Sequence, residues 1–402
     1  MHLFFKYISF LSITSLLSVI VLHAQGVSFP VTNIIEPLSF SRIGVSEWAS
    51  GGVRTVEVGS PSAAFNNPAL LRAQILSVYV EFGKRTETEY YIPELKYDGQ
   101  YLLPNFGMIA TQLDDFTVAL GYASMYDEYQ YSEFQATTVE QPDGTGEVIE
   151  ATTSEIVHSI TASASYSFDN ILSLGLTSGL NIVAKRDQIF HTQAEGSGTG
   201  VNLILGFYFH PMESFHMGGT VRYSNGISYT TKMEGPVLNR QVDIDSGMAG
   251  NNPNINAQLT TNEYPYIAKF PLMIAAGFRF DVAYEFSLLV EAELAKWYDI
   301  DSYRYNNTIN THVGFIFRPL QSVKLRGGYF TQNDPGKLTS HWPLLDQQFW
   351  TTGVEVEVMH GATFSVSTVQ SFYSKTRIAG FIPLYRQIVN QDLFLAGIQY
   401  QL

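Results

Sequence analysis

From Ile75 to the last residue, the chain repeats short segments in which apolar and polar residues alternate, separated by turn residues. A period of two is the pattern of a strand with one apolar and one polar face. In the first segment, one face carries the apolar Leu76, Val78, Val80 and Phe82, and the other face carries Ser77, Tyr79 and Glu81. About fourteen such segments follow one another, which restricts the chain to an all-β fold with many antiparallel strands.

The composition places these strands in a membrane. Only 15% of the residues are charged, whereas about a quarter is usual in soluble domains. The mean hydropathy is nevertheless +0.02, so the apolar residues are dispersed rather than gathered in long runs. Dispersal of this kind is typical of a transmembrane barrel, in which every second residue faces lipid. The sequence therefore predicts a transmembrane antiparallel β-barrel in a Gram-negative outer membrane.

Charge and cysteine content exclude several function classes. The net charge of -14 leaves no basic surface for phosphates, so we expect no nucleic-acid partner. The chain has no Cys, which excludes disulfides, thiol catalysis and thiolate-bound metals.

Residues 1–24 read as a secretory signal peptide. Lys6 lies in the positively charged region, residues 8–22 form the apolar core, and residues 22–24 (LHA) fit a cleavage site. The alternative is a single membrane anchor, for which this run is short and is interrupted by Ser and Thr.

Residues 25–74 do not alternate, and we interpret them as an N-terminal hatch (plug) inside a barrel formed by residues 75–402. Within them, Gly51–Ala73 is rich in small residues and is broken by Pro61 and Pro68. Asn67 precedes Pro68, which keeps it out of the helical region and favours a turn. The alternative is an ordinary loop ahead of a β-sandwich.

The lengths of the connections support the barrel. Every second connection is short, and the short ones are 113–115, 168–170, 211–214, 281–285, 319–322 and 359–361. The longer ones between them include 133–153, 233–264, 332–347 and 374–391. Short periplasmic turns that alternate with longer outer loops are typical of outer-membrane barrels. A Greek-key sandwich gives no reason for this rhythm.

Local motifs add a family resemblance. The chain ends on an alternating strand that carries Phe394, Ile398 and Leu402, although outer-membrane barrels usually end on Phe. Three motifs resemble the FadL/TodX-like transporters, and 270–278 (FPLMIAAGF) is a weaker match. The three are 62–69 (SAAFNNPA), similar to the hatch motif, 325–330 (LRGGYF), similar to a late strand, and 343–353 (PLLDQQFWTTG), similar to a Pro-Asp block.

The resemblance implies a fourteen-stranded barrel that is plugged by its own N-terminus. Long-chain fatty acids or other hydrophobic small molecules would enter by apolar outer loops, reach a pocket in the lumen and leave sideways as the hatch shifts. Outer-membrane lipid and the barrel-assembly machinery are the other expected partners, and no cofactor is expected. Barrels of the PorV type, which serve protein secretion or surface attachment, share the Asn-Pro-Ala motif and remain the alternative. A non-specific porin is a third hypothesis.

Two sets of residues are candidates for ligand binding. The first is apolar and falls in expected outer loops, where it forms an entry groove or, alternatively, packs to close the barrel top: Met233, Val237, Leu238, Trp342, Leu344, Leu345 and Phe381. The second set is the cations Arg279, Lys324 and Arg326, which alternation places in the lumen, where a ligand carboxylate is one partner. Their alternative partners are Glu291, Glu293, Glu355 and Glu357.

We assign Asn67, Pro68 and Ala69 to the tip of the hatch, with a plain turn as the alternative. No catalytic residues are predicted, because the histidines lack metal-ligand spacing, and Ser159 lies on the opposite strand face from its neighbour His158. The acidic stretch 127–147 is either solvated or a calcium site.

Overall fold

The structure is a computed structural model and describes residues 34–37, 43–73, 75–91, 95–135, 148–168, 171–189, 192–238, 257–337, 344–377 and 387–402. The chain divides into two units, Met1–Ile34 and Ile35–Leu402, and the second carries the fold. The predicted signal peptide, residues 1–24, lies outside the described residues. No helix among the described residues is long and apolar enough to cross a membrane.

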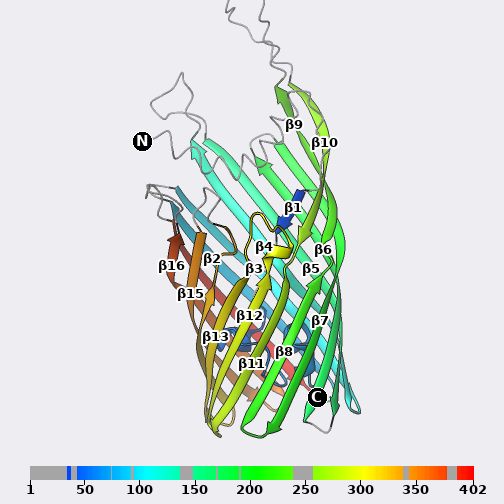
Figure 1. Cartoon of the computed structure of the whole chain (residues 1–402), viewed down its shortest axis with the longest axis vertical. Coiled ribbons are helices and arrows are strands. Elements are labelled where there is room, and N and C mark those ends of the chain that lie inside the picture. Colours follow the sequence, from blue (N-terminus) through cyan, green and yellow to red (C-terminus); the bar gives the residue numbers. More distant parts are fainter. Residues whose placement is uncertain are drawn as a thin grey trace, which may run out of the picture. The chain divides into compact units, whose positions relative to one another are not determined.

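Strands dominate the fold (Figure 1). They are β1 (Ile34–Pro37), β2 (Ser77–Tyr91), β3 (Leu95–Leu113), β4 (Phe116–Gln135), β5 (Val148–Phe168), β6 (Leu172–Ile189), β7 (Thr192–Met212), β8 (Phe215–Ser224), β9 (Ile227–Leu238), β10 (Ala257–Lys269), β11 (Leu272–Ala283), β12 (Phe286–Lys296), β13 (Thr308–Leu320), β14 (Val323–Gln332), β15 (Leu344–Met359), β16 (Ala362–Arg377) and β17 (Gln387–Gln401). The helices are α2 (Val45–Ala49), α3 (Ala63–Asn66), and the 3-10 turns η1 (Pro68–Leu70) and η2 (Trp297–Asp299).

Strands β2 to β17 close into an antiparallel barrel of fourteen positions, which confirms the predicted strand number. The circle closes between β17 and β2. At two positions of the barrel, two shorter strands lie end to end. Strands β8 and β9 share one position, and both pair with β7. Strands β10 and β11 share the next position, where β11 pairs with β8 and β10 pairs with β9. The breaks fall at Asn225–Gly226 and at Phe270–Pro271, where Gly226 has φ +79° and proline lacks a donor.

The two faces of each strand differ as the alternation predicts. On β2, Val80 and Phe82 are 41% and 48% exposed on the outside, whereas Tyr79 and Glu81 are buried inside. Similar outward apolar side chains recur around the circle and form the band that a lipid environment requires. The C-terminal strand follows the same rule, with Phe394 and Ile398 pointing outward.

All six predicted short connections are confirmed and lie at one end, called here the short-turn end. At the long-loop end the strands continue further than predicted: β4 reaches Gln135, β9 reaches Leu238 and β15 begins at Leu344. The predicted long loops were therefore too long. Beyond the lipid band both strand faces meet water, so the apolar alternation fades although backbone pairing continues.

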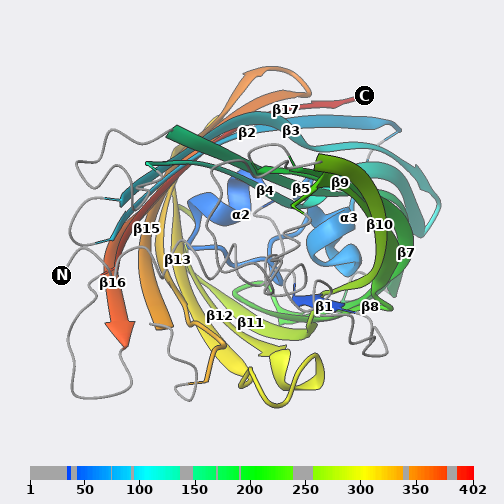
Figure 2. The same cartoon turned by 90° about the horizontal axis from the view of Figure 1, so that it is seen from above.

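Residues 43–73, called here the inner segment, lie within the ring of strands (Figure 2). Val45 and Trp48 of α2 share a buried cluster with residues of β14 to β17: Phe330, Phe349, Val369, Leu393 and Leu395. A second cluster joins Val53 and Val56 to Leu289 and Ile316 of the wall. The inner segment therefore packs against the lumenal face at two places.

Candidate functional site

The inner segment rests on glycines of the barrel wall. A Cβ atom added at these glycines would overlap atoms of the inner segment, so only glycine permits the close approach. Three pairs of cross-strand partners do this: Gly175 with Gly206, which meet residues 67–69; Gly314 with Gly328, which meet residues 50–51; and Gly218 with Gly277, which meet Thr55. The glycines form a seat that fixes the height of the inner segment in the lumen.

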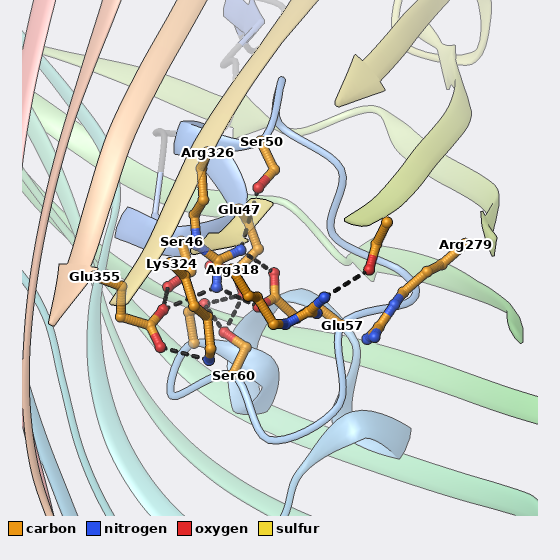
Figure 3. Close-up of polar contacts among 12 residues, drawn as sticks. Ser46, Glu47, Ser50, Glu57, Ser60, Arg279, Arg318, Lys324, Arg326 and Glu355 are labelled. Carbon is orange, nitrogen blue, oxygen red and sulfur yellow. Dashed lines mark hydrogen bonds and ion pairs between the residues drawn. The ribbon is translucent and has the colours of Figure 1, made fainter. Parts of the chain in front are cut away.

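Ion pairs tie the inner segment to β14 and β15 (Figure 3). Arg326 donates from Nη1 to Oε2 of Glu57 (2.7 Å) and from Nη2 to Oε1 (2.5 Å), and Nη2 also lies 2.8 Å from Oε2 of Glu355. Lys324 Nζ contacts Oε1 of Glu355 at 2.6 Å. The network binds one carboxylate of the inner segment and one of the wall around a single buried guanidinium.

A second anchor lies on β12. Glu291 accepts hydrogen bonds from the backbone N–H groups of Arg54 (2.7 Å) and Thr55 (2.9 Å), and from the Thr55 hydroxyl (2.8 Å). The Arg54 guanidinium pairs with Glu293, two residues further on the same lumenal face. Charge-assisted bonds of this kind are about twice as strong as neutral ones, so β12 holds the middle of the inner segment.

A third anchor begins the inner segment. Glu81 of β2 accepts from the backbone N–H of Gly44 (3.1 Å) and of Val45 (3.1 Å) and from the hydroxyl of Tyr79 (2.9 Å). This carboxylate satisfies N–H groups at the start of α2, which have no partner within the helix.

Inside the inner segment, Glu47 of α2 is buried and bonds to the hydroxyls of Ser60 and Ser62. Burial and the nearby Glu57 carboxylate raise the pKa of Glu47, while the two serine hydrogen bonds lower it by less. The protonated form is therefore favoured relative to a carboxyl in water.

Residues 67–69, the predicted tip of the hatch, form a hydrogen-bonded turn. Asn67 Nδ2 donates to the backbone oxygen of Thr55 (2.8 Å) and to that of Phe207 on β7 (3.1 Å), and its Oδ1 accepts from the N–H of Ala69 (3.2 Å). Pro68 begins η1, where a missing N–H costs nothing. Asn67 thus joins two parts of the inner segment to the wall.

A cavity of about 440 Å³ lies on the long-loop side of α2. Trp48 and Arg54 of the inner segment form part of its lining, with Phe330, His312 and Leu393 from the wall. Trp48 packs edge-on against Phe330, with ring centroids 5.1 Å apart, and His312 stacks on Phe330 at 5.6 Å. The inner segment is the floor of this cavity.

The wall beside the cavity is split. Strands β3 and β4 pair from Leu113 and Phe116 up to Phe106 and Ala123, and among the described residues no pair joins them beyond that point. Met125 forms a bulge in β4, which continues along β5. Asn105 and Tyr126, just beyond the last pair, line the cavity. The cavity therefore reaches the split.

Solved structures with the same architecture identify this fold. The Pseudomonas putida toluene transporter TodX matches with a TM-score of 0.66 at 12% identity, over 92% of this chain and 100% of TodX. A Pseudomonas aeruginosa FadL homologue gives 0.66 at 13%, over 90% and 99% of the two chains. The Ralstonia pickettii toluene transporter TbuX gives 0.64 at 10%, over 89% and 98%. The chain has the FadL/TodX-like fold.

No family model matches the chain, and no curated protein matches it by sequence. The structural likeness, together with the apolar outer band, makes the protein an integral barrel of the outer membrane. Of the solved barrels named above, TodX and TbuX are described as toluene transporters.

In this FadL/TodX-like barrel, several predicted ligand-binding residues lie on strands. Met233, Val237 and Leu238 belong to β9, and Leu344 and Leu345 begin β15, so their assignment to loops was wrong. The side chains of these five lie outside the described part of the chain, as do residues Trp342 and Phe381. Their contact with a ligand stays a prediction. Most of the acidic stretch 127–147 also lies outside it.

The predicted cations all lie in the lumen and take part in ion pairs. Arg326 and Lys324 belong to the network described above, and Arg279 Nε contacts Oδ1 of Asp281 at 2.8 Å. The alternative partner Glu355 was thus correct for two of them, whereas Asp281 was not foreseen. Ligand binding by these cations stays a prediction.

The seat glycines and the apolar lumenal residues were missed. Leu289 breaks the polar face of β12, and Ile316 does so on β13; both are fully buried against the inner segment. An apolar residue on the otherwise polar face, or a glycine at the same height on neighbouring strands, is the sequence signal that marks the contact.

Proposed function

We propose that this barrel carries hydrophobic small molecules passively across the outer membrane and that the inner segment is its movable hatch. The structural neighbours support the class of cargo, since two are toluene transporters and another is described as a monoaromatic hydrocarbon channel. Among long-chain fatty acids and hydrocarbons, the neighbours named for toluene favour small aromatic compounds as first candidates.

One observation carries the proposal: the cavity touches both the inner segment and the split between β3 and β4. Trp48 and Arg54 form its floor, while Asn105 and Tyr126 lie at the split. An apolar compound that leaves through the split enters the bilayer directly and never has to cross a water-filled pore. In the proposed route, the cavity receives the compound from the outer loops and releases it through an exit at the split.

The hatch role rests on how the inner segment is held. Beside the two apolar clusters, discrete polar contacts at Glu57, Arg54 and Asn67 join it to the wall. Such polar contacts can be exchanged for others without disturbing the apolar outer band. A ligand that binds better when the inner segment has shifted would increase the population of that state.

Deletion of residues 51–69 tests the hatch. We expect the shortened barrel to insert in the outer membrane, which heat-modifiable migration on a gel would show. We expect its flux of toluene or oleate into proteoliposomes to differ from the flux through the intact chain. Unchanged flux would contradict the proposal. A purified barrel that holds no small molecule by mass spectrometry and instead retains a secreted protein in fixed stoichiometry would favour the assembly function.

A further inference from the structure

Building on the transport function above, we propose that the cavity selects neutral amphiphiles, which combine a ring with hydroxyl or other neutral oxygen groups, over plain hydrocarbons and ionised acids. Three properties of the lining favour such ligands: its carboxamides, its aromatic floor and its balanced charge.

Carboxamides are frequent in the lining. Six of its twenty-four residues carry one: Asn105, Asn310, Gln332, Asn333, Gln347 and Gln391. A carboxamide offers two donors and an acceptor without charge, which suits hydroxyl, ether and carbonyl groups. A cavity for hydrocarbons alone gains nothing from such groups, because each must be desolvated when an apolar ligand enters.

Three buried polar atoms of the lining have no hydrogen-bond partner within the part of the chain that the structure describes. They are Nε2 of Gln347, Oε1 of Gln391 and Oγ1 of Thr308, in residues that are 4%, 8% and 7% exposed. They belong to the alternate strands β15, β17 and β13, so one strand lies between each and the next. One donor, one acceptor and one hydroxyl are thus available to a bound molecule.

The floor favours a ring. Trp48, His312 and Phe330 meet there, and Phe330 stacks in turn on Phe349 with centroids 4.5 Å apart. Flat, rigid faces pack well against aromatic or alicyclic rings and lose little conformational entropy on binding. The polar atoms on β15 and β17 lie above this floor, so a ring below and oxygen groups above fit the arrangement.

The charges of the lining balance. The lining holds two cations, Arg54 and Arg85, and two carboxylates, Glu293 and Asp334, and the Arg54 guanidinium also lies 3.7 Å from Glu291. An ionised carboxylate that entered would find no surplus positive charge to replace its hydration. Neutral ligands are therefore favoured over acids of the same skeleton.

A matched series of probes tests the inference: biphenyl, its neutral hydroxymethyl derivative and its carboxylate. Titration calorimetry of the detergent-solubilised full chain, corrected for micelle partition, gives the three dissociation constants. We expect the hydroxymethyl compound to bind about five- to tenfold more tightly than either of the others, the gain of one added hydrogen bond. Equal or tighter binding of biphenyl or the carboxylate, or binding of none, would overturn the inference.

Two variants locate the preference. Gln347→Met and Gln391→Met together keep side-chain length but remove both carboxamides. In this double variant we expect the hydroxymethyl compound and biphenyl to bind with about equal dissociation constants. Gln348→Met, the neighbour on the opposite face of β15, is the control and keeps the preference. A preference that survives in the double variant would overturn the inference. Biphenyl flux into proteoliposomes is measured separately. If biphenyl crosses but the hydroxymethyl compound is not preferred, the transport function stands and only the selectivity inference fails.

Discussion

Arg326 of the wall and Glu57 of the inner segment form a two-pronged ion pair, with N–O distances of 2.7 and 2.5 Å, across 269 residues of sequence. Their side chains are 1% and 10% exposed, so water does not screen the pair. A buried pair that loses one partner leaves a charge without compensation. The position of the inner segment is therefore most sensitive at this contact.

Glu57→Gln tests that sensitivity. Glu355 remains as a partner of Arg326, so the guanidinium keeps one carboxylate. We therefore expect the free energy that holds the inner segment in place to fall by on the order of 2–3 kcal/mol, less than if the charge lost both partners. Hydrogen exchange measured by mass spectrometry should show protection of residues 43–57 reduced about 30- to 150-fold. Glu213→Gln, in an exposed turn, is the control. Unaltered protection in Glu57→Gln would show that the pair does not hold the inner segment.

Gly175→Ala tests the glycine seat. The new Cβ would overlap the backbone at Pro68 and Ala69, which cannot rotate away as a side chain would. We expect the turn to be displaced at a cost of about 1–3 kcal/mol, seen as faster exchange or proteolysis of residues 62–71 in an otherwise intact barrel. At Gly107 the nearest atom is 3.8 Å from an added Cβ, so Gly107→Ala is the matched control. Equal behaviour of the two variants would refute the seat.

A reversible cross-link tests the lateral exit. The chain has no cysteine, so Asn105→Cys with Ser124→Cys introduces one pair across the split between β3 and β4. We expect oxidation to reduce toluene flux at least tenfold and reductant to restore it. The control pair Thr111→Cys and Val118→Cys joins the same strands where they are already paired. Full flux through the oxidised split would exclude this exit.

Burial of Glu47 predicts that the seating of the inner segment depends on pH. Because the pKa of Glu47 is raised above its ordinary 4.5, its contribution is fully present below that value and is lost as pH rises through the higher, folded value. The Glu57 carboxylate is the charged neighbour that opposes its ionisation. We expect protection of residues 43–62 to decrease with rising pH in the intact chain and much less in Glu47→Gln. The same slope in both would assign the dependence to another group.

Several structural features followed from local sequence. Val80 faces outward and Glu81 inward because a strand alternates whatever it pairs with, and the lumenal positions of Glu291 and Arg326 followed in the same way. The six short turns were also predictable, since each interrupts the alternation where two strands reverse direction. A motif resemblance pointed to the fold that the solved structures share.

Other features were hidden in the sequence. The extension of β9 to Leu238 lies at the long-loop end and is defined by backbone pairing with β10, which the residue pattern does not record. The breaks at Asn225–Gly226 and Phe270–Pro271 lie in the middle of strands and affect only backbone pairing. Neither leaves a pattern that periodicity can detect.

By itself, the sequence determined the strands, their facing and the short turns, because each depends on residues that are neighbours in the chain and on the contrast between lipid and lumen. The tertiary structure alone decided which residues meet. Glu57 meets Arg326, Gly175 meets Pro68, and Gln347 and Gln391 share a cavity only because the barrel closes around the inner segment at one particular height. That height is fixed by close packing and buried ion pairs between distant segments, and no local pattern records it.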